Sequence, residues 1–137
     1  MGEPQAEYSD VSENLRHYAN MRFAQLTVFA AVNGGLIAWF ADTSSSNPSV
    51  MEKTVTIVIA SIGMLAAIVF FVLEIRSAAY WTQFKERAVE LEKQLGYLQY
   101  TRAPKRSGIT ATNATRFFHV MVILLWLAAI IYAACRT

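Results

Sequence analysis

The sequence predicts an all-α membrane protein with three transmembrane helices, the first two of which continue into the cytoplasm as long helices. Three separate runs of 19 or 20 residues contain no Asp, Glu, Lys or Arg, and the chain is 55% hydrophobic and only 16% charged. A helix of that length is about 30 Å long, which matches the hydrocarbon core of a bilayer. Strands are excluded because lipid offers an open strand no hydrogen-bond partners.

Length, charge and cysteine content exclude several other classes. A chain of 137 residues forms a single domain. The net charge of +2 gives no electrostatic reason to expect a nucleic-acid partner. A single cysteine, Cys135, excludes an internal disulfide framework and a multi-cysteine metal cluster.

The three uncharged runs cover residues 23–41, 54–73 and 117–135. A soluble three-helix bundle is the alternative, but these runs have no polar face wide enough to meet water. The first run does not have the pattern of a cleaved signal peptide, because acidic residues dominate the segment before it and the bulky Trp39 precedes its end. We therefore interpret it as a permanent span.

The distribution of basic residues predicts the orientation. Residues 74–116 contain eight Lys and Arg, whereas residues 42–53 contain one. Basic loops stay in the cytoplasm, so the N-terminus is expected inside and the C-terminus outside.

The first two helices are expected to extend beyond the membrane. Asp10 and Glu13 have the spacing of a capping box, which predicts that the first helix begins near Asp10. The second helix is expected from Met51 to Leu98, with a cytoplasmic extension over residues 74–98 that carries apolar residues at heptad spacing. These seam residues are Trp81, Phe84, Ala88, Leu91, Leu95 and Leu98. The seam is longer than the cytoplasmic part expected for the first helix, so we expect it to pack on that helix and on a second partner.

Small residues recur at steps of three and four along two spans. In the first span they are Ala24, Thr27, Ala31, Gly34, Ala38 and Ala41, and in the second Thr56, Ala60, Gly63 and Ala67. Such stripes allow helix backbones to approach closely in lipid. The hairpin is expected to use one stripe internally, and the other favours a homo-oligomer whose subunit number the pattern does not give.

Few polar side chains lie within the spans. Asn33 is expected either to hydrogen-bond across helices or to line a pore, and Gln25 and Thr27 are further candidates for these roles. His119 is expected to extend to the headgroups, with a proton relay as the alternative. Because no acid–base pair, metal-ligand spacing or phosphate-binding loop is recognisable, we predict neither an enzyme nor a cofactor.

The segment of residues 101–113 is predicted to be a basic loop. Arg102, Lys105 and Arg106 place positive charge near the inner leaflet. They can act as a topology signal, as contacts for anionic lipid headgroups, or as an anion site.

Two segments of the sequence carry a resemblance to known families. Residues 18–27 (YANMRFAQLT) lead into the first span, and residues 86–96 (ERAVELEKQLG) lie in the extension. With the order of helices, they resemble the RipA-like small octameric bacterial inner-membrane proteins. That resemblance implies a ring-like octamer without established catalytic residues. The layout is also similar to SLATT-type two-span effectors of defence systems, which are thought to form pores and usually accompany a sensor module.

Three functions are compatible with these features. The first is a membrane channel or pore whose axis is lined by the first or second span. The second is a non-conducting scaffold or regulatory protein whose cytoplasmic seam, residues 81–98, binds an unidentified protein. The third is a defence-type pore-forming effector.

Overall fold

The described part of the protein consists mainly of long helices. A computed structural model describes residues 3–43, 49–102 and 110–135, and within these ranges the regular elements are all helices. They are α1 (Pro4–Thr43), α2 (Val50–Leu95) and α3 (Ala111–Cys135), and each is long and apolar enough to cross a membrane. The predicted fold class is confirmed.

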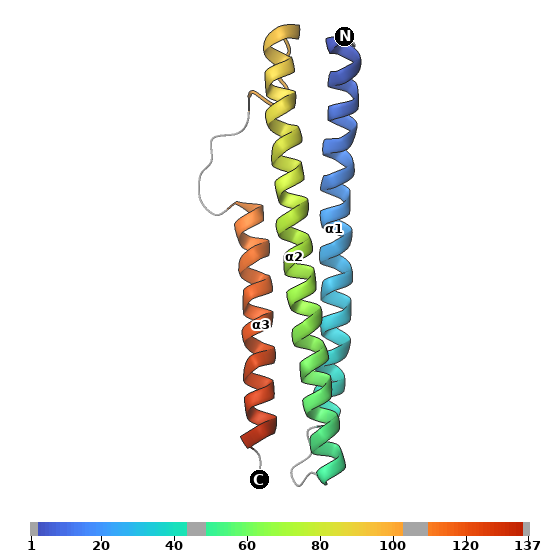
Figure 1. The fold of residues 1–137 in the computed structure, drawn as a ribbon, viewed down its shortest axis with the longest axis vertical. Coiled ribbons are helices and arrows are strands. Elements are labelled where there is room, and N and C mark those ends of the chain that lie inside the picture. The colour runs from blue at the N-terminus through green and yellow to red at the C-terminus, as the bar shows by residue number, and fades with distance from the viewer. Residues whose placement is uncertain (1–2, 44–48, 103–109, 136–137) are drawn as a thin grey trace.

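Helices α1 and α2 form a long antiparallel hairpin, and α3 lies along one half of it (Figure 1). Helix α2 is central, because it packs against α1 and also against α3. We call the part that includes α3 the membrane half (residues 23–43, 50–73 and 111–135). The rest of the hairpin is the polar half (residues 4–22 and 74–95).

Helix α1 begins six residues earlier than the sequence pattern predicted. Its first residue is Pro4, because proline lacks an N–H and has a fixed φ that suits the first helical position. Asp10 lies inside the helix, where its carbonyl accepts a hydrogen bond from the Asn14 side chain at 2.9 Å. The predicted cap at Asp10 and Glu13 is therefore wrong, since nothing in the preceding segment ends a helix.

Helix α2 has a defined signal at each end. Ser49 and Glu52 form a capping box, in which the Ser49 hydroxyl accepts from the Glu52 N–H at 3.3 Å and Glu52 accepts from the Ser49 N–H at 2.6 Å. The helix ends where Gly96 adopts a left-handed conformation with φ of 74°. Leu98 therefore lies beyond the helix, not at its last turn as predicted.

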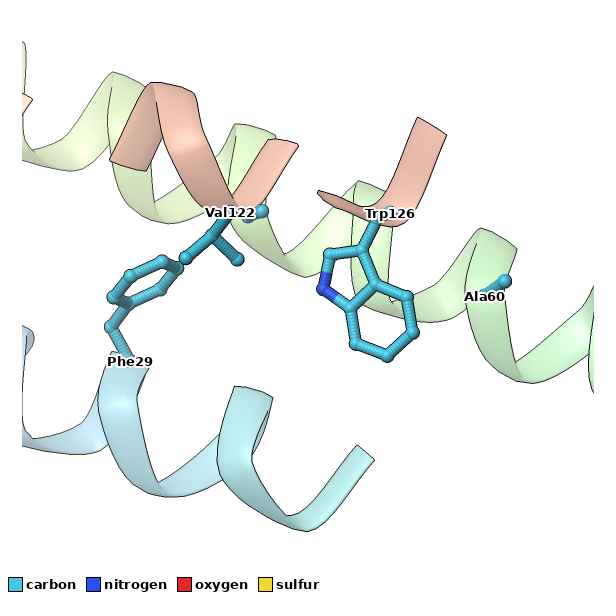
Figure 2. Packing of buried hydrophobic residues seen from close by; sticks show 5 residues of the cluster. Phe29, Ala60, Val122 and Trp126 are labelled. Atoms are coloured by element: carbon cyan, nitrogen blue, oxygen red, sulfur yellow. The ribbon is translucent and has the colours of Figure 1, made fainter. Parts of the chain in front are cut away.

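Two apolar clusters hold the helices together. In the membrane half, Phe29 of α1 points toward Val122 of α3, and Trp126 extends from α3 beside Ala60 of α2 (Figure 2). In the polar half, Val11 and Leu15 of α1 pack against Ala88 and Leu91 of α2.

Candidate assembly surfaces and buried polar groups

Asn33 joins α1 to α3 inside the protomer. It is only 3% exposed. Its side-chain oxygen accepts a hydrogen bond from the Trp126 indole N–H at 2.8 Å, and its amide nitrogen donates to the Phe29 carbonyl at 2.9 Å. Of the two predicted roles for Asn33, the structure shows the hydrogen bond between helices. A pore-lining role would require its side chain to face outward, and it does not.

His119 is buried against α1, contrary to the expectation that it extends to the headgroups. It is 2% exposed, and its ring stacks on Phe29 with centroids 4.2 Å apart. The Nδ1 atom lies 2.8 Å from the Thr115 carbonyl oxygen, which assigns the proton to Nδ1. The face of α3 that carries His119 also carries Val122 and Trp126, so packing directs it inward.

Gln25 and Thr27 lie on different sides of α1. The Gln25 side-chain oxygen accepts from the Ser77 hydroxyl of α2 at 3.2 Å, which links the two helices near the boundary of the membrane half. Thr27 is exposed, and its hydroxyl donates to the Phe23 carbonyl of its own helix at 3.0 Å. Of these two residues, only Thr27 faces outward.

All three helices meet at an ion pair that the sequence reasoning missed. Arg22 of α1 pairs with Glu74 of α2 in a bidentate arrangement, with Nε 3.1 Å from one carboxylate oxygen. The same guanidinium donates to the Thr112 hydroxyl of α3 at 3.2 Å. The sequence did contain a signal for this pair: Arg22 immediately precedes the first uncharged run and Glu74 immediately follows the second, so an antiparallel hairpin brings them to the same level.

Glu92 forms a second polar site, at the far end of the polar half. It is 1% exposed. Its carboxylate accepts from the Tyr8 hydroxyl at 3.0 Å, from the backbone N–H groups of Tyr100 and Thr101 at 2.7 and 2.8 Å, and from the Thr101 hydroxyl at 2.7 Å. The site therefore ties the start of α1 to the chain reversal after α2.

The hydrogen bonds at Glu92 outweigh the effect of its burial. Burial raises the pKa of the Glu92 carboxyl, but donors from Thr101, Tyr100 and Tyr8 stabilise the carboxylate and lower the pKa to about 2. Burial, the hydrogen bond to Glu92 and the charge of Glu92 raise the pKa of Tyr8 to about 12. Both groups thus keep the protonation states that the hydrogen bond requires over the whole physiological range.

The two stripes of small residues have opposite environments. The α2 stripe, residues Thr56, Ala60, Gly63 and Ala67, is buried within the protomer. A Cβ added at Gly63 would fall 2.2 Å from Cε2 of Trp126. The stripe on α1 is exposed at each position: Ala24, Thr27, Ala31, Gly34, Ala38 and Ala41. A Cβ added at Gly34 meets no atom within 4 Å among the described residues.

The predicted seam on α2 packs on α1 of the same chain. Ala88 and Leu91 are buried, and Trp81 and Phe84 pack beside them against the same cluster. Leu95 is half-buried, whereas Leu98 is exposed. The expectation of a second partner for the seam rested on a short first helix, and the early start of α1 at Pro4 removes that reason.

Of the predicted basic loop, residues 101–113, the structure describes residues 101–102 and 110–113. The last three of these belong to α3, which begins at Ala111, so the loop ends earlier than predicted. Arg102 is exposed, and Lys105 and Arg106 lie outside the described residues. Within the described ranges, no group of three His, Cys, Asp or Glu side chains comes together to hold a metal ion.

Three apolar helices, polar groups directed into the protomer and an exposed face of small residues define a small helical membrane protein suited to self-assembly. The chain belongs to the octameric membrane protein family (8xMP), whose family model matches residues 5–135. No curated protein and no solved structure matches it. Family membership supports an octameric assembly, whereas the narrower RipA-like and SLATT-type resemblances stay predictions.

Proposed function

We propose that the protein is a ring-like homo-octameric scaffold of the bacterial inner membrane that does not conduct ions. The observation that carries this proposal is the use of polar side chains in the membrane half. Asn33, Gln25 and His119 are each bonded within the protomer, and the side chains that face outward are mainly apolar. A water-filled axis needs polar groups along its wall, and these three are not available to line it.

The exposed stripe on α1 is the proposed contact between subunits. Its members are small, and they occupy the side of α1 opposite Phe29 and Asn33, which pack inward. Close backbone approach increases the van der Waals packing that helps to drive helix association in lipid, where no hydrophobic driving force acts between helices. The α1 stripe is therefore open to a neighbouring subunit, whereas the α2 stripe is already packed within the chain.

Native mass measurement of the purified protein in detergent tests this contact. The unaltered chain should appear as an octamer, and Ala31→Leu or Ala38→Leu should dissociate it by separating the helix backbones. Ala128→Leu is the matched control, because Ala128 is also exposed in the membrane half but lies on α3. Equal dissociation by the control would contradict the assignment of the contact to α1.

Conductance in planar bilayers separates the scaffold from the channel and from the pore-forming effector. The octamer should show no ion current above that of the empty bilayer. A current that changes with Thr27→Val would contradict the scaffold and favour a pore lined by α1, because Thr27 is the polar member of its exposed stripe.

The proposed orientation places the polar half in the cytoplasm. Cys135 is the single cysteine of the chain and is exposed at the end of α3. A membrane-impermeant maleimide should therefore label Cys135 in spheroplasts before lysis. Labelling only after lysis would reverse the orientation.

A further inference from the structure

A groove opens where the membrane half meets the polar half. It has a volume of about 990 Å³ and is formed by all three helices. Its wall includes Arg22, Glu74 and Arg116, each of which borders one end of an uncharged run. The groove therefore lies at the level where hydrocarbon gives way to lipid headgroups.

The charged side chains that line the groove have one more positive than negative charge. Arg22, Lys85 and Arg116 contribute three cations, and Glu74 and Glu86 contribute two anions. The Arg22–Glu74 pair is internally neutralised. The Nε atom of Arg116 is buried and has no hydrogen-bond partner among the described residues. A buried guanidinium N–H without an acceptor requires an explanation, and an acceptor that enters from the groove would supply one.

Helix α3 adds a second attraction for an anion. Its first turn, with Thr112 and Asn113, forms part of the groove wall, so the positive end of the helix dipole is directed there. The Asn113 N–H is capped by the Thr110 hydroxyl at 3.2 Å. The unneutralised guanidinium of Arg116 and the helix end together form an electropositive corner.

One part of the wall is apolar. Phe23 and Leu26 of α1 and Ala78 and Ala79 of α2 line the same groove. Phe23 and Leu26 belong to the first uncharged run, so this apolar wall leads into the hydrocarbon level. An acyl chain would pack against such a wall, whereas a free phosphate ion would gain nothing from it.

We propose that this groove binds an anionic membrane phospholipid, with the headgroup phosphate on Arg116 and the start of α3 and the acyl chains beside Phe23 and Leu26. Guanidinium groups match phosphate oxygens with two parallel N–H donors. Arg102, the one residue of the predicted basic group that the structure describes, does not belong to the groove wall.

The test uses the full-length protein in nanodiscs that contain equal amounts of phosphatidylglycerol and phosphatidylcholine. Native mass spectrometry after release counts the lipids that each subunit retains. The unaltered protein should retain phosphatidylglycerol in preference, and Arg116→Gln should lower that retention about fivefold, the effect of one cationic contact near a membrane.

Two further variants keep the result interpretable. Arg76→Gln is the matched control, because Arg76 has the same charge and lies two residues from Glu74, which places it on the opposite side of α2 from the groove. It should retain phosphatidylglycerol as the unaltered protein does. Ala79→Trp fills the groove without altering charge, and it should reduce retention of both lipids.

The outcomes decide between the sources of phosphate. Equal loss in Arg116→Gln and Arg76→Gln would overturn the proposal, because general surface charge would then explain retention. Displacement of phosphatidylglycerol by millimolar inorganic phosphate, with the same dependence on Arg116, would also overturn it in favour of a free-anion site. Retention that depends on Arg116 and Ala79 and resists inorganic phosphate would support it.

Discussion

The α1 and α2 stripes are alike in composition and spacing, yet the protomer buries one and exposes the other. Gly63 of α2 lies against the Trp126 ring, whereas Gly34 of α1 has open space beside it. The difference follows from position, because α2 packs on both sides and α1 packs mainly on α2. A stripe of small residues thus identifies a surface suited to close helix packing, but it does not identify the helix that packs against it.

The largest expected effect comes from enlarging the buried stripe. Gly63→Leu places side-chain atoms where the Trp126 ring lies, since even a Cβ would fall 2.2 to 2.5 Å from three ring atoms. We expect a loss of about 3 kcal/mol in stability, at the upper end for overpacked cores. Thermal unfolding in detergent, followed by tryptophan fluorescence, measures it. An unaltered midpoint would show that α3 is not held in this position.

Glu92 offers a change far from both stripes. Glu92→Gln keeps the shape but removes the charge that four donors stabilise, so we expect a loss of about 2 kcal/mol at the end of the hairpin. Faster hydrogen exchange at the Tyr100 and Thr101 amides is the measurement. Glu90→Gln is the control, because Glu90 is exposed and pairs only at the surface with Arg87. Dissociation of the octamer by Glu92→Gln would show that the polar half also contributes to assembly.

The same carboxylate predicts a direction of pH dependence. Its pKa is lowered from 4.5 to about 2 in the folded protein, so its contribution to stability is complete above pH 4.5 and is lost as the pH falls toward 2. The exchange rate of the Thr101 amide, corrected for intrinsic chemistry, should rise over that window. The Glu92→Gln variant should show no such rise, and a similar rise in both proteins would exclude Glu92 as its cause.

A smaller effect is expected at the hydrogen bond between α1 and α3. Asn33→Leu removes the acceptor of the Trp126 indole N–H, at a cost of about 1 kcal/mol. Trp126→Phe should remove the same bond, so the double variant should lose less than the sum of the two single variants. Full additivity in thermal unfolding would show that the bond contributes nothing.

The smallest effect on the protomer is expected from the exposed stripe. Gly34→Leu meets no atom within 4 Å of its Cβ, so the packing of α3 on α2 should change by less than about 0.5 kcal/mol. Hydrogen exchange in α3 is the local measurement, and native mass should show loss of the octamer. Faster exchange in α3 with an intact octamer would reverse the roles of the two stripes.

Local signals predicted the helices well and their partners poorly. The uncharged runs identify the three spans because a bilayer imposes a minimum apolar length. The start of α1 was misplaced because a capping box at Asp10 and Glu13 is a local pattern, and Pro4 starts a helix equally well. The hydrogen bond from Tyr8 to Glu92 could not be found, since Tyr8 is 84 positions away along the chain.

The sequence by itself determined the three apolar helices, the continuation of the hairpin beyond the membrane half and the presence of two close-packing stripes, because these depend on hydropathy and helical periodicity. The tertiary structure decided which stripe is buried within the protomer and that His119 and Asn33 face inward. It also brought Arg22, Glu74 and Arg116 together at one groove. The physical reason is that periodicity defines a face of a helix, whereas the partner of that face depends on which other helix is packed beside it.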